Sequence, residues 1–203
     1  MRCGIGQWSG LLLVLVAWDL QAADEHYSGV KVEPRMDVNF SFYDVKANDG
    51  QGLREHLLQV APKTTTGHRA IGKAVYQVDW KLDLNQQSDA CQLFGVHVMT
   101  KVNVVMPNWL QLSKLTESTQ NSWNGFLSAM MEYEGRHKDI VKDAVQKIGD
   151  GIANLPVNSS CQALREQANA VGETQLEKAR EQVRRYQSET GNGRYMGVAY
   201  PKL

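Results

Sequence analysis

A glutamate and a histidine in the second half of the chain have the types and the spacing that zinc hydrolases use. Glu134 and His137 lie in the stretch Tyr133-Glu134-Gly135-Arg136-His137. In the helical pattern His-Glu-x-x-His, two histidines on one face bind a Zn²⁺ ion, and the glutamate activates the metal-bound water as a general base. The chain has the glutamate and the second histidine, but Tyr133 stands at the first ligand position. The stretch therefore predicts either an altered metal site or a structural Glu–His pair.

Periodicity places this pair on the inner face of a long helix. Apolar residues recur at helical spacing from about 117 to 150, and Leu127, Glu134 and Val141 follow one another every seven residues. A carboxylate on a core-facing stripe costs several kcal/mol unless it is hydrogen-bonded or paired. Such a cost is typical of a functional site, so we treat Glu134 and His137 as the candidate site residues.

The elements before this helix are predicted to be strands. Val38, Phe40 and Phe42 alternate with polar residues and predict a half-buried strand at about 38–45, after an irregular stretch at 24–37. A short helix is expected at 51–60. Two long alternating runs, at about 74–84 and 91–105, predict an antiparallel hairpin that ends at the segment 106–109.

A second long helix is expected to begin near Asn158 or Ser159, after Gly149, Gly151 and Pro156 end the first. A tight turn at 190–193 and a short closing strand at about 195–200 complete the chain. Strands followed by two long helices indicate an α+β fold: an N-terminal antiparallel sheet with a short helix, then two long helices, of which 117–150 is the zincin-like active-site helix.

The N-terminus has the features of an export signal. Arg2, an apolar run from Leu11 to Trp18 and small residues at 22–23 predict a signal peptide at 1–23 and one domain at 24–203; a retained anchor is the alternative. We expect a periplasmic or secreted protein with no transmembrane segment after cleavage. The chain has 22 basic and 22 acidic residues, which gives no indication of a nucleic-acid partner.

Two cysteines remain after the signal, Cys91 and Cys161. In an oxidising compartment an even pair predicts one disulfide, which would link the sheet region to the second long helix. Two buried free thiols are the alternative.

A set of short motifs, in this order, gives the chain a family resemblance. The motifs are Tyr43-Asp44-Val45, Gly52-Leu53-Arg54, Ala74 to Trp80, Cys91, Met106-Pro107-x-Trp109, Trp123-x-x-Phe126, Glu134-Gly-x-His137, Cys161-x-x-Leu164 and Tyr186-x-x-x-Thr190-Gly191-x-Gly193. With them the chain resembles the bacterial family of uncharacterised domains described as predicted secreted Zn-dependent proteases. The resemblance covers nearly all of the chain after the signal.

The resemblance implies a zinc site that this chain has altered. Members of that family carry His-Glu-x-x-His and a further histidine near the C-terminus. In this chain the first histidine of the pattern falls on Tyr133, and the C-terminal histidine falls on Asn192. One imidazole with weak oxygen donors should bind Zn²⁺ poorly. We therefore expect no bound zinc, with zinc binding as the alternative, and a Tyr133–Glu134–His137 hydrogen-bonded trio close to Asn192.

Three functions follow from these observations. The first is an exported relative of the proteases with a degenerate metal site, which binds a peptide or an envelope protein in a cleft between sheet and helix. Trp109 and Trp123 are placed near that cleft, or in the core. The second is an active zinc peptidase with Glu134 as general base and His137 as ligand. The third is a structural periplasmic protein without pocket chemistry.

Overall fold

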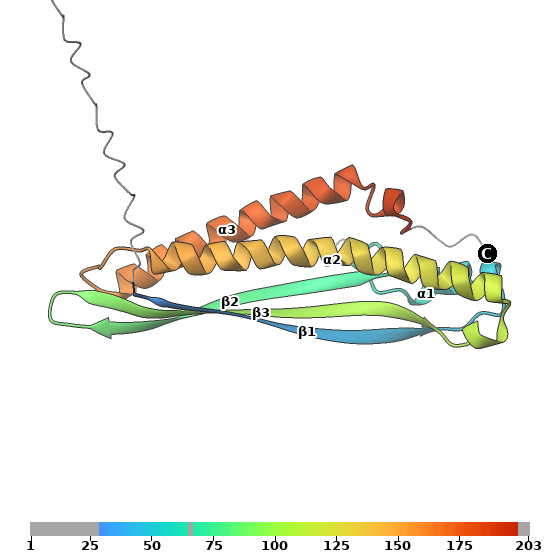
Figure 1. Cartoon of the computed structure of the whole chain (residues 1–203), viewed down its shortest axis with the longest axis horizontal. Helices are drawn as coiled ribbons and strands as arrows, with labels where there is room; N and C mark the ends of the chain where they lie inside the picture. Colours follow the sequence, from blue (N-terminus) through green and yellow to red (C-terminus); the bar gives the residue numbers. More distant parts are fainter. Residues whose placement is uncertain (1–28, 65–66, 199–203) are drawn as a thin grey trace, which may run out of the picture.

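The computed structural model describes residues 29–64 and 67–198. The signal peptide predicted at 1–23 lies outside them. A three-stranded sheet forms one layer and two long helices form the other (Figure 1). The elements are β1 (Lys31–Val45), α1 (Gly50–Val60), β2 (Lys73–Gln86), β3 (Cys91–Trp109), η1 (Leu112–Lys114), α2 (Glu117–Ala153), α3 (Cys161–Glu189) and η2 (Arg194–Met196). The predicted α+β class, with strands first and two long helices after them, is confirmed.

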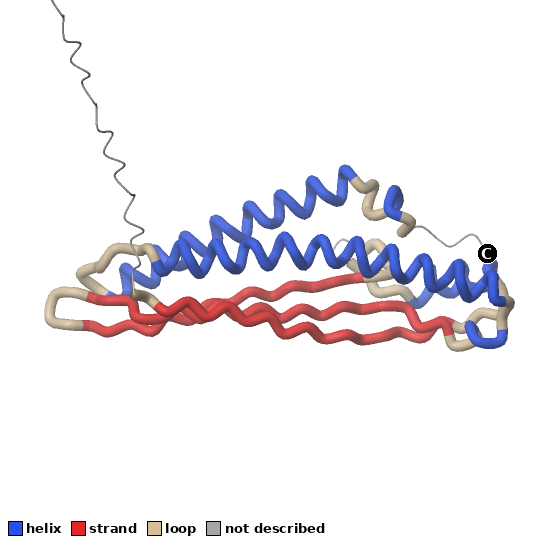
Figure 2. The backbone as a smooth tube through the Cα atoms, viewed as in Figure 1, coloured by secondary structure: helices blue, strands red, loops and turns tan. Residues whose placement is uncertain are grey.

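The predicted hairpin of β2 and β3 is present. The two strands pair antiparallel from Lys73↔Val105 to Gln86↔Cys91. The alternation of apolar and polar residues in β2 fits a strand with one covered face, because most even-numbered residues are partly covered while the odd-numbered ones between them face water. Both long helices lie on one side of the sheet, and the other side is open (Figure 2).

β1 differs from its prediction in three ways. It begins at Lys31, so the stretch 31–37 is strand and not irregular, and it pairs with β3 in parallel, which makes the sheet mixed rather than antiparallel. Its apolar residues are also more exposed than a half-buried strand implies. The strand order is β1-β3-β2, which leaves one edge of β1 without a neighbouring strand among the described residues.

β3 does not end at about Val105, as the sequence predicted, but continues through the segment 106–109 to Trp109. Pro107 lies opposite Tyr43 of β1, beyond the last β2 pair at Val105. At that point β3 has a neighbour on one side only, so the missing N–H of Pro107 leaves no ladder bond broken.

The core lies between the inner face of the sheet and α2. Trp109 and Trp123 are 3% and 1% exposed, and their rings meet edge to face at 5.4 Å. Trp109 also donates its indole N–H to the carbonyl of Ala47 at 2.8 Å. The two tryptophans therefore pack in the core and do not line a cleft.

α2 runs past the glycines that were predicted to end it. Gly149 lies inside the helix, where a Cβ atom would come within 2.5 Å of the Val32 side chain of β1. Glycine is thus used here for close packing of helix on strand. Within the described residues, no helix has both the length and the apolar composition needed to cross a membrane.

α3 begins slightly later than predicted: its cap is Ser160 rather than Asn158 or Ser159, and the Ser160 hydroxyl accepts the N–H of Ala163 at 3.1 Å. The predicted disulfide between Cys91 and Cys161 is present and ties the start of β3 to the first turn of α3. The turn at 190–193 is also present, with positive φ at Gly191, Asn192 and Gly193. The closing strand is wrong for the described part, because 194–196 forms a 3-10 helix.

Candidate functional site

α2 places Glu134 and His137 on its inner face, as their spacing predicted. His137 is 6% exposed, and the side chain of Glu134 is 13% exposed. Nδ1 of His137 lies 3.1 Å from Oε2 of Glu134, so the imidazole donates to the carboxylate. Nε2 of His137 is buried and has no hydrogen-bond partner among the described residues. The pair is therefore a bonded Glu–His pair with one free ring nitrogen.

Two tyrosines enclose this histidine. The Tyr133 ring lies edge-on to His137, with ring centres 4.6 Å apart. Tyr186, which comes from α3, stacks on Tyr133 at 5.3 Å and meets His137 edge-on at the same distance. We call Tyr133, Glu134, His137 and Tyr186 the tyrosine–histidine cluster. In the sequence Tyr186 was the first residue of a family motif, and its contact with the site was missed.

The Tyr133 hydroxyl is held in its neutral form. Burial raises the pKa of Tyr133 to about 12, and the Glu134 carboxylate adds to the shift. Interactions with the side chains of Thr190 and Gln187 act in the opposite direction and are smaller. At neutral pH the phenol is protonated, so Tyr133 is a weak metal ligand.

Asn192, the position matched to a third ligand, lies on the turn after α3. Its side chain is exposed, its φ is 57°, and its N–H donates to the Gln187 carbonyl at 2.7 Å. In the described part of the chain no hydrogen bond joins its side chain to the cluster. The neighbouring Gly193 is the residue that packs on Tyr133, since a Cβ there would lie 3.1 Å from the Tyr133 ring. The ring that completes the cluster is that of Tyr186.

The donors of the cluster do not match a zinc site. Across 29–64 and 67–198, no three histidine, cysteine, aspartate or glutamate side chains are grouped so that they could hold a metal ion. A catalytic zinc needs three deprotonated protein donors around one point. The cluster offers one imidazole nitrogen, one carboxylate that is already hydrogen-bonded to that imidazole, and two protonated phenols.

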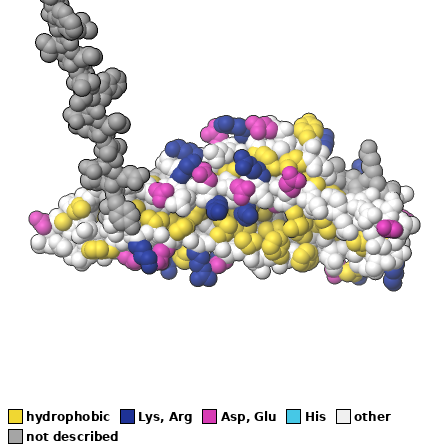
Figure 3. All heavy atoms as spheres, in the orientation of Figure 1, with side chains coloured by type: hydrophobic (Ala, Val, Ile, Leu, Met, Phe, Trp, Pro, Cys, Tyr) yellow, Lys and Arg dark blue, Asp and Glu magenta, His cyan; other side chains and the backbone are white. Residues whose placement is uncertain are grey.

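A groove runs beside the cluster between β1 and α2. One hollow of about 170 Å³ is lined by residues that include Phe40, Met131, Glu134 and Lys138. A second hollow of about 650 Å³ continues along β1 past Met36 and Lys142. Figure 3 shows apolar side chains gathered in a band on this face of the molecule. We call the two hollows together the β1–α2 groove.

The floor of the groove is unusually apolar for an open surface. Val38 and Phe40 of β1 are 45% and 52% exposed, and Met131 of α2 is 57% exposed. Phe42, which lies beyond the lining of the two hollows, is 66% exposed. The even-numbered residues of β1 share the helix-facing side of the sheet with the buried residues of β3 opposite them. A contiguous exposed apolar surface of this kind is typical of a binding site.

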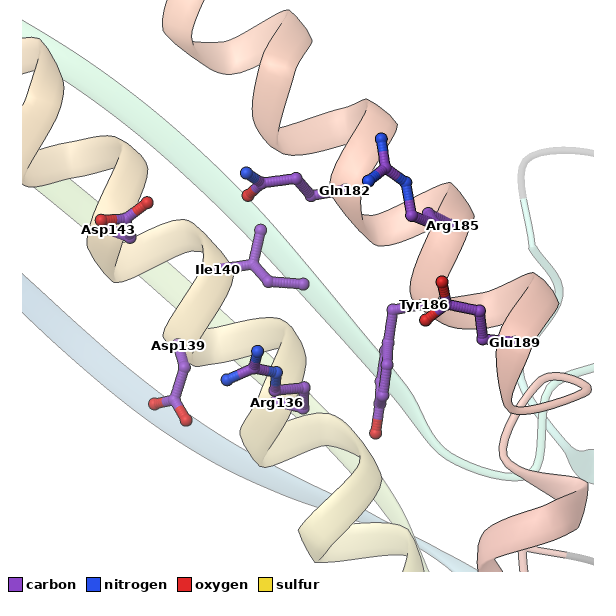
Figure 4. A pocket seen from close by; sticks show the side chains of 8 residues that line it. All are labelled: Arg136, Asp139, Ile140, Asp143, Gln182, Arg185, Tyr186 and Glu189. Carbon is purple, nitrogen blue, oxygen red and sulfur yellow. The ribbon is translucent and has the colours of Figure 1, made fainter.

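The hollow on the far side of α2 is more polar. It measures about 390 Å³ and lies between α2 and α3, where Tyr186 and Arg185 of α3 face Arg136 and Ile140 of α2 (Figure 4). Charged side chains of both signs rim it, and the Tyr186 hydroxyl is already bonded to the sulfur of Met196 at 2.9 Å. It gives no direct access to Glu134.

His97 lies on the open face of the sheet. Its Nδ1 is 2.9 Å from Glu33 of β1 and its Nε2 is 2.8 Å from Asp83 of β2, and the hydrogen bond to Asp83 raises the pKa of His97. The side chain links the three strands. His56 accepts the N–H of Lys46 at 3.2 Å, and His68 is exposed in a loop. None of these histidines approaches the cluster.

Comparison with known proteins gives a family but no activity. The model of a family described as a bacterial protein of unknown function, DUF922, matches residues 40–193, which is more than half of the chain and includes the whole cluster. No curated protein and no solved structure matches the chain.

Proposed function

This chain belongs to the DUF922 family, and we propose that it is a peptide-binding protein of the cell envelope, which takes up an extended peptide segment as a fourth strand beside β1. The β1–α2 groove is the binding site, Glu134 of the tyrosine–histidine cluster lines one end of it, and the ligand is bound without hydrolysis. One observation carries the proposal: β1 is an edge strand whose helix-facing apolar side chains are about half exposed.

The edge of β1 supports binding through the backbone. β1 has 15 residues and, among the described residues, pairs with another strand on one side only, so a row of N–H and C=O groups lies along its other edge. Pro34 has no N–H. In a regular edge strand, proline occupies a position whose N–H would point away from the neighbouring strand. Side chains and N–H groups both alternate with a period of two, so the even-numbered residues direct their N–H groups to the free edge. Strand addition is a common mode of peptide recognition.

The side chains supply the remaining affinity. A peptide strand placed next to β1 would lay alternate side chains on Val38, Phe40 and Met131, which are exposed without it. Exposed apolar area contributes about 25 cal/mol for each Å² that a ligand covers. An aromatic anchor such as Phe40 is the kind of residue that dominates binding energy at interfaces.

The envelope location is supported by the disulfide. A bond between Cys91 and Cys161 is stable in an oxidising compartment, as the predicted signal peptide requires. In such a location, strand addition would capture unfolded or extended segments of other exported proteins.

Replacing Phe40 with aspartate tests the groove. The substitution places a charge on the apolar floor, and we expect the affinity for a short labelled peptide of alternating valine and threonine to fall at least about tenfold, measured by fluorescence anisotropy. Mass spectrometry of the peptide after prolonged incubation should show it intact.

Phe94→Asp is the matched control. Phe94 is 48% exposed, close to the 52% of Phe40, but it lies in β3 on the sheet face away from the helices. Equal loss of binding in both variants, or none in either, would refute the groove as the site. Circular dichroism melting of both variants establishes that each is folded.

A zinc peptidase is the second candidate, and one observation favours it. The Glu134 carboxylate accepts Nδ1–H of His137 and leaves Nε2 buried without a partner, which is how carboxylates orient histidines that bind zinc. Stoichiometric zinc in protein purified without a chelator, lost in His137→Ala, would establish this candidate and overturn the proposal of binding without hydrolysis.

The cluster geometry predicts how zinc binding would be restored. Three imidazoles around one tetrahedral Zn²⁺ have ring centres about 5 Å apart, and the three rings of the cluster are 4.6 to 5.3 Å apart. We expect Tyr133→His with Tyr186→His to bind Zn²⁺ at one equivalent, measured by titration calorimetry. Tyr133→His with Asn192→His should remain without zinc because position 192 is exposed on the turn. The opposite ranking would show that Asn192 is the third ligand position.

A further inference from the structure

Two lysines on α2 border the floor of the β1–α2 groove. Lys138 lines both hollows, and Lys142 lines the larger one beside residues 34–38 of β1. Neither forms an ion pair with any residue of the described ranges. Figure 3 shows Lys and Arg side chains directly along the apolar band. Long lysine stems pack on apolar surface and leave the ammonium groups free to bind a ligand.

The acidic residues nearby neutralise these lysines only in part. Asp139 lines the larger hollow with them, and it has no ion-pair partner among the described residues. Asp143 is bonded to Lys147 at 2.6 Å, on the same helix. Arg35, the other cation at this hollow, is bonded to Asp37 at 3.0 Å. Of the groups that line the larger hollow and have no ion-pair partner among the described residues, Lys138 and Lys142 are positive and Asp139 is negative, so the two lysines leave a net positive charge.

The other end of the groove has the opposite character. The smaller hollow contains Glu134 with Phe40, Met131 and Met106, and its only cation is Lys138. A carboxylate placed there would be repelled by Glu134, whereas an uncharged apolar side chain would cover exposed carbon. The two ends of the groove therefore differ: the end beside residues 34–38 is positively charged, and the end beside Glu134 is apolar with a negative charge.

We propose that the strand bound in the β1–α2 groove is an acidic–apolar peptide, whose aspartate or glutamate side chains bind Lys138 and Lys142 while its apolar side chains lie toward Phe40 and Glu134. This inference rests on the peptide binding proposed above and adds the chemistry of the ligand.

The spacing of the two lysines defines the spacing of the acidic residues. Four residues of helix advance about 6 Å along the axis, so Lys138 and Lys142 are separated by that distance along the groove. Two residues of an extended strand advance about 6.6 Å and point to the same face. Acidic residues at positions i and i+2 of the peptide therefore match the two lysines, whereas adjacent acidic residues point to opposite faces.

Three labelled peptides with one shared apolar half test the inference. Their other halves carry Glu-x-Glu, Gln-x-Gln or Lys-x-Lys. For the full chain we expect the Glu-x-Glu peptide to bind about tenfold more tightly than the Gln-x-Gln peptide, and the Lys-x-Lys peptide to bind most weakly. The preference should shrink as salt is raised from low to high concentration. A fourth peptide with adjacent glutamates should lose most of it.

The variant K138E/K142E should reverse the order of the three peptides. K178E is the matched control, because Lys178 is an exposed lysine of α3 that does not line the groove, and it should preserve the order. If K138E/K142E does not fold, the salt dependence of the unaltered chain decides instead.

The outcomes separate the two proposals. Binding of all three peptides with equal affinity overturns the acidic preference and leaves peptide binding intact. Binding of none of them overturns peptide binding itself. Self-association of the chain that Phe40→Asp abolishes, measured by sedimentation, would assign the groove to a second copy and overturn both.

Discussion

Replacing Cys91 and Cys161 together with alanine is expected to lower the free energy of unfolding by about 4 kcal/mol. The disulfide joins residues 70 positions apart, and closing a loop of that length removes a large part of the conformational entropy of the unfolded chain. The substitution also removes a link between two elements, because Cys91 is fully buried at the start of β3 and Cys161 opens α3. The backbone pairing of Cys91 with Asn158, just before α3, would remain.

Urea unfolding followed by circular dichroism measures this loss. The unaltered chain treated with a reductant should shift to a similar midpoint, which separates the effect of the bond from that of the substituted side chains. If the double variant and the oxidised chain unfold at the same urea concentration, the disulfide makes no contribution to stability and the expectation is refuted.

The second large effect is expected from Gly172→Ala in α3. A Cβ at this position would lie 2.4 Å from the Trp80 ring of β2, and that ring is held in place by a 3.0 Å hydrogen bond from its N–H to Asn169. The helix must therefore move away from the sheet. We expect a loss of about 2 kcal/mol, since overpacking typically costs about 1 to 3 kcal/mol and exceeds the gain in helix propensity.

Gly125→Ala provides the matched comparison for Gly172→Ala. Gly125 lies in α2, where an added Cβ has no neighbour within 4 Å. The same substitution should there raise the free energy of unfolding by up to about 1 kcal/mol. If the close helix–sheet contact at Gly172 causes the loss of stability, the melting temperature should fall in Gly172→Ala and rise in Gly125→Ala. Melting temperatures that shift in the same direction in both variants would refute this cause.

The fold was predictable where residue patterns and local contacts agree. The hairpin of β2 and β3 has clean alternation over both strands, and α2 and α3 have long helical stripes with caps at their starts. β1 was less accessible to prediction. Its first half carries Lys31, Glu33, Pro34 and Arg35, which read as a loop, and only the parallel pairing with β3 makes that stretch a strand.

The candidate site was predictable in part. The seven-residue spacing places Glu134 and His137 on the inner face of one helix, and this is a local property. Tyr186 joins them because α3 packs along α2. The residue spacing within one helix does not predict which residues of another helix it will contact. A cleft between sheet and helix was expected, but the residues that line it were not: alternation in β1 predicts which side Val38 and Phe40 face, but not that α2 leaves that side partly uncovered.

The parallel pairing of β1 with β3 also determines when β1 can fold. Each residue of β1 pairs with one 64 positions later, as Lys31 does with Gly95, whereas β2 and β3 meet through a short turn. At about 5 to 20 residues per second, a growing chain presents β1 for roughly 3 to 13 s before all of its partner strand exists. The hairpin closes within microseconds once it is complete. We therefore expect β1, the first strand to be made, to be the last to join the sheet.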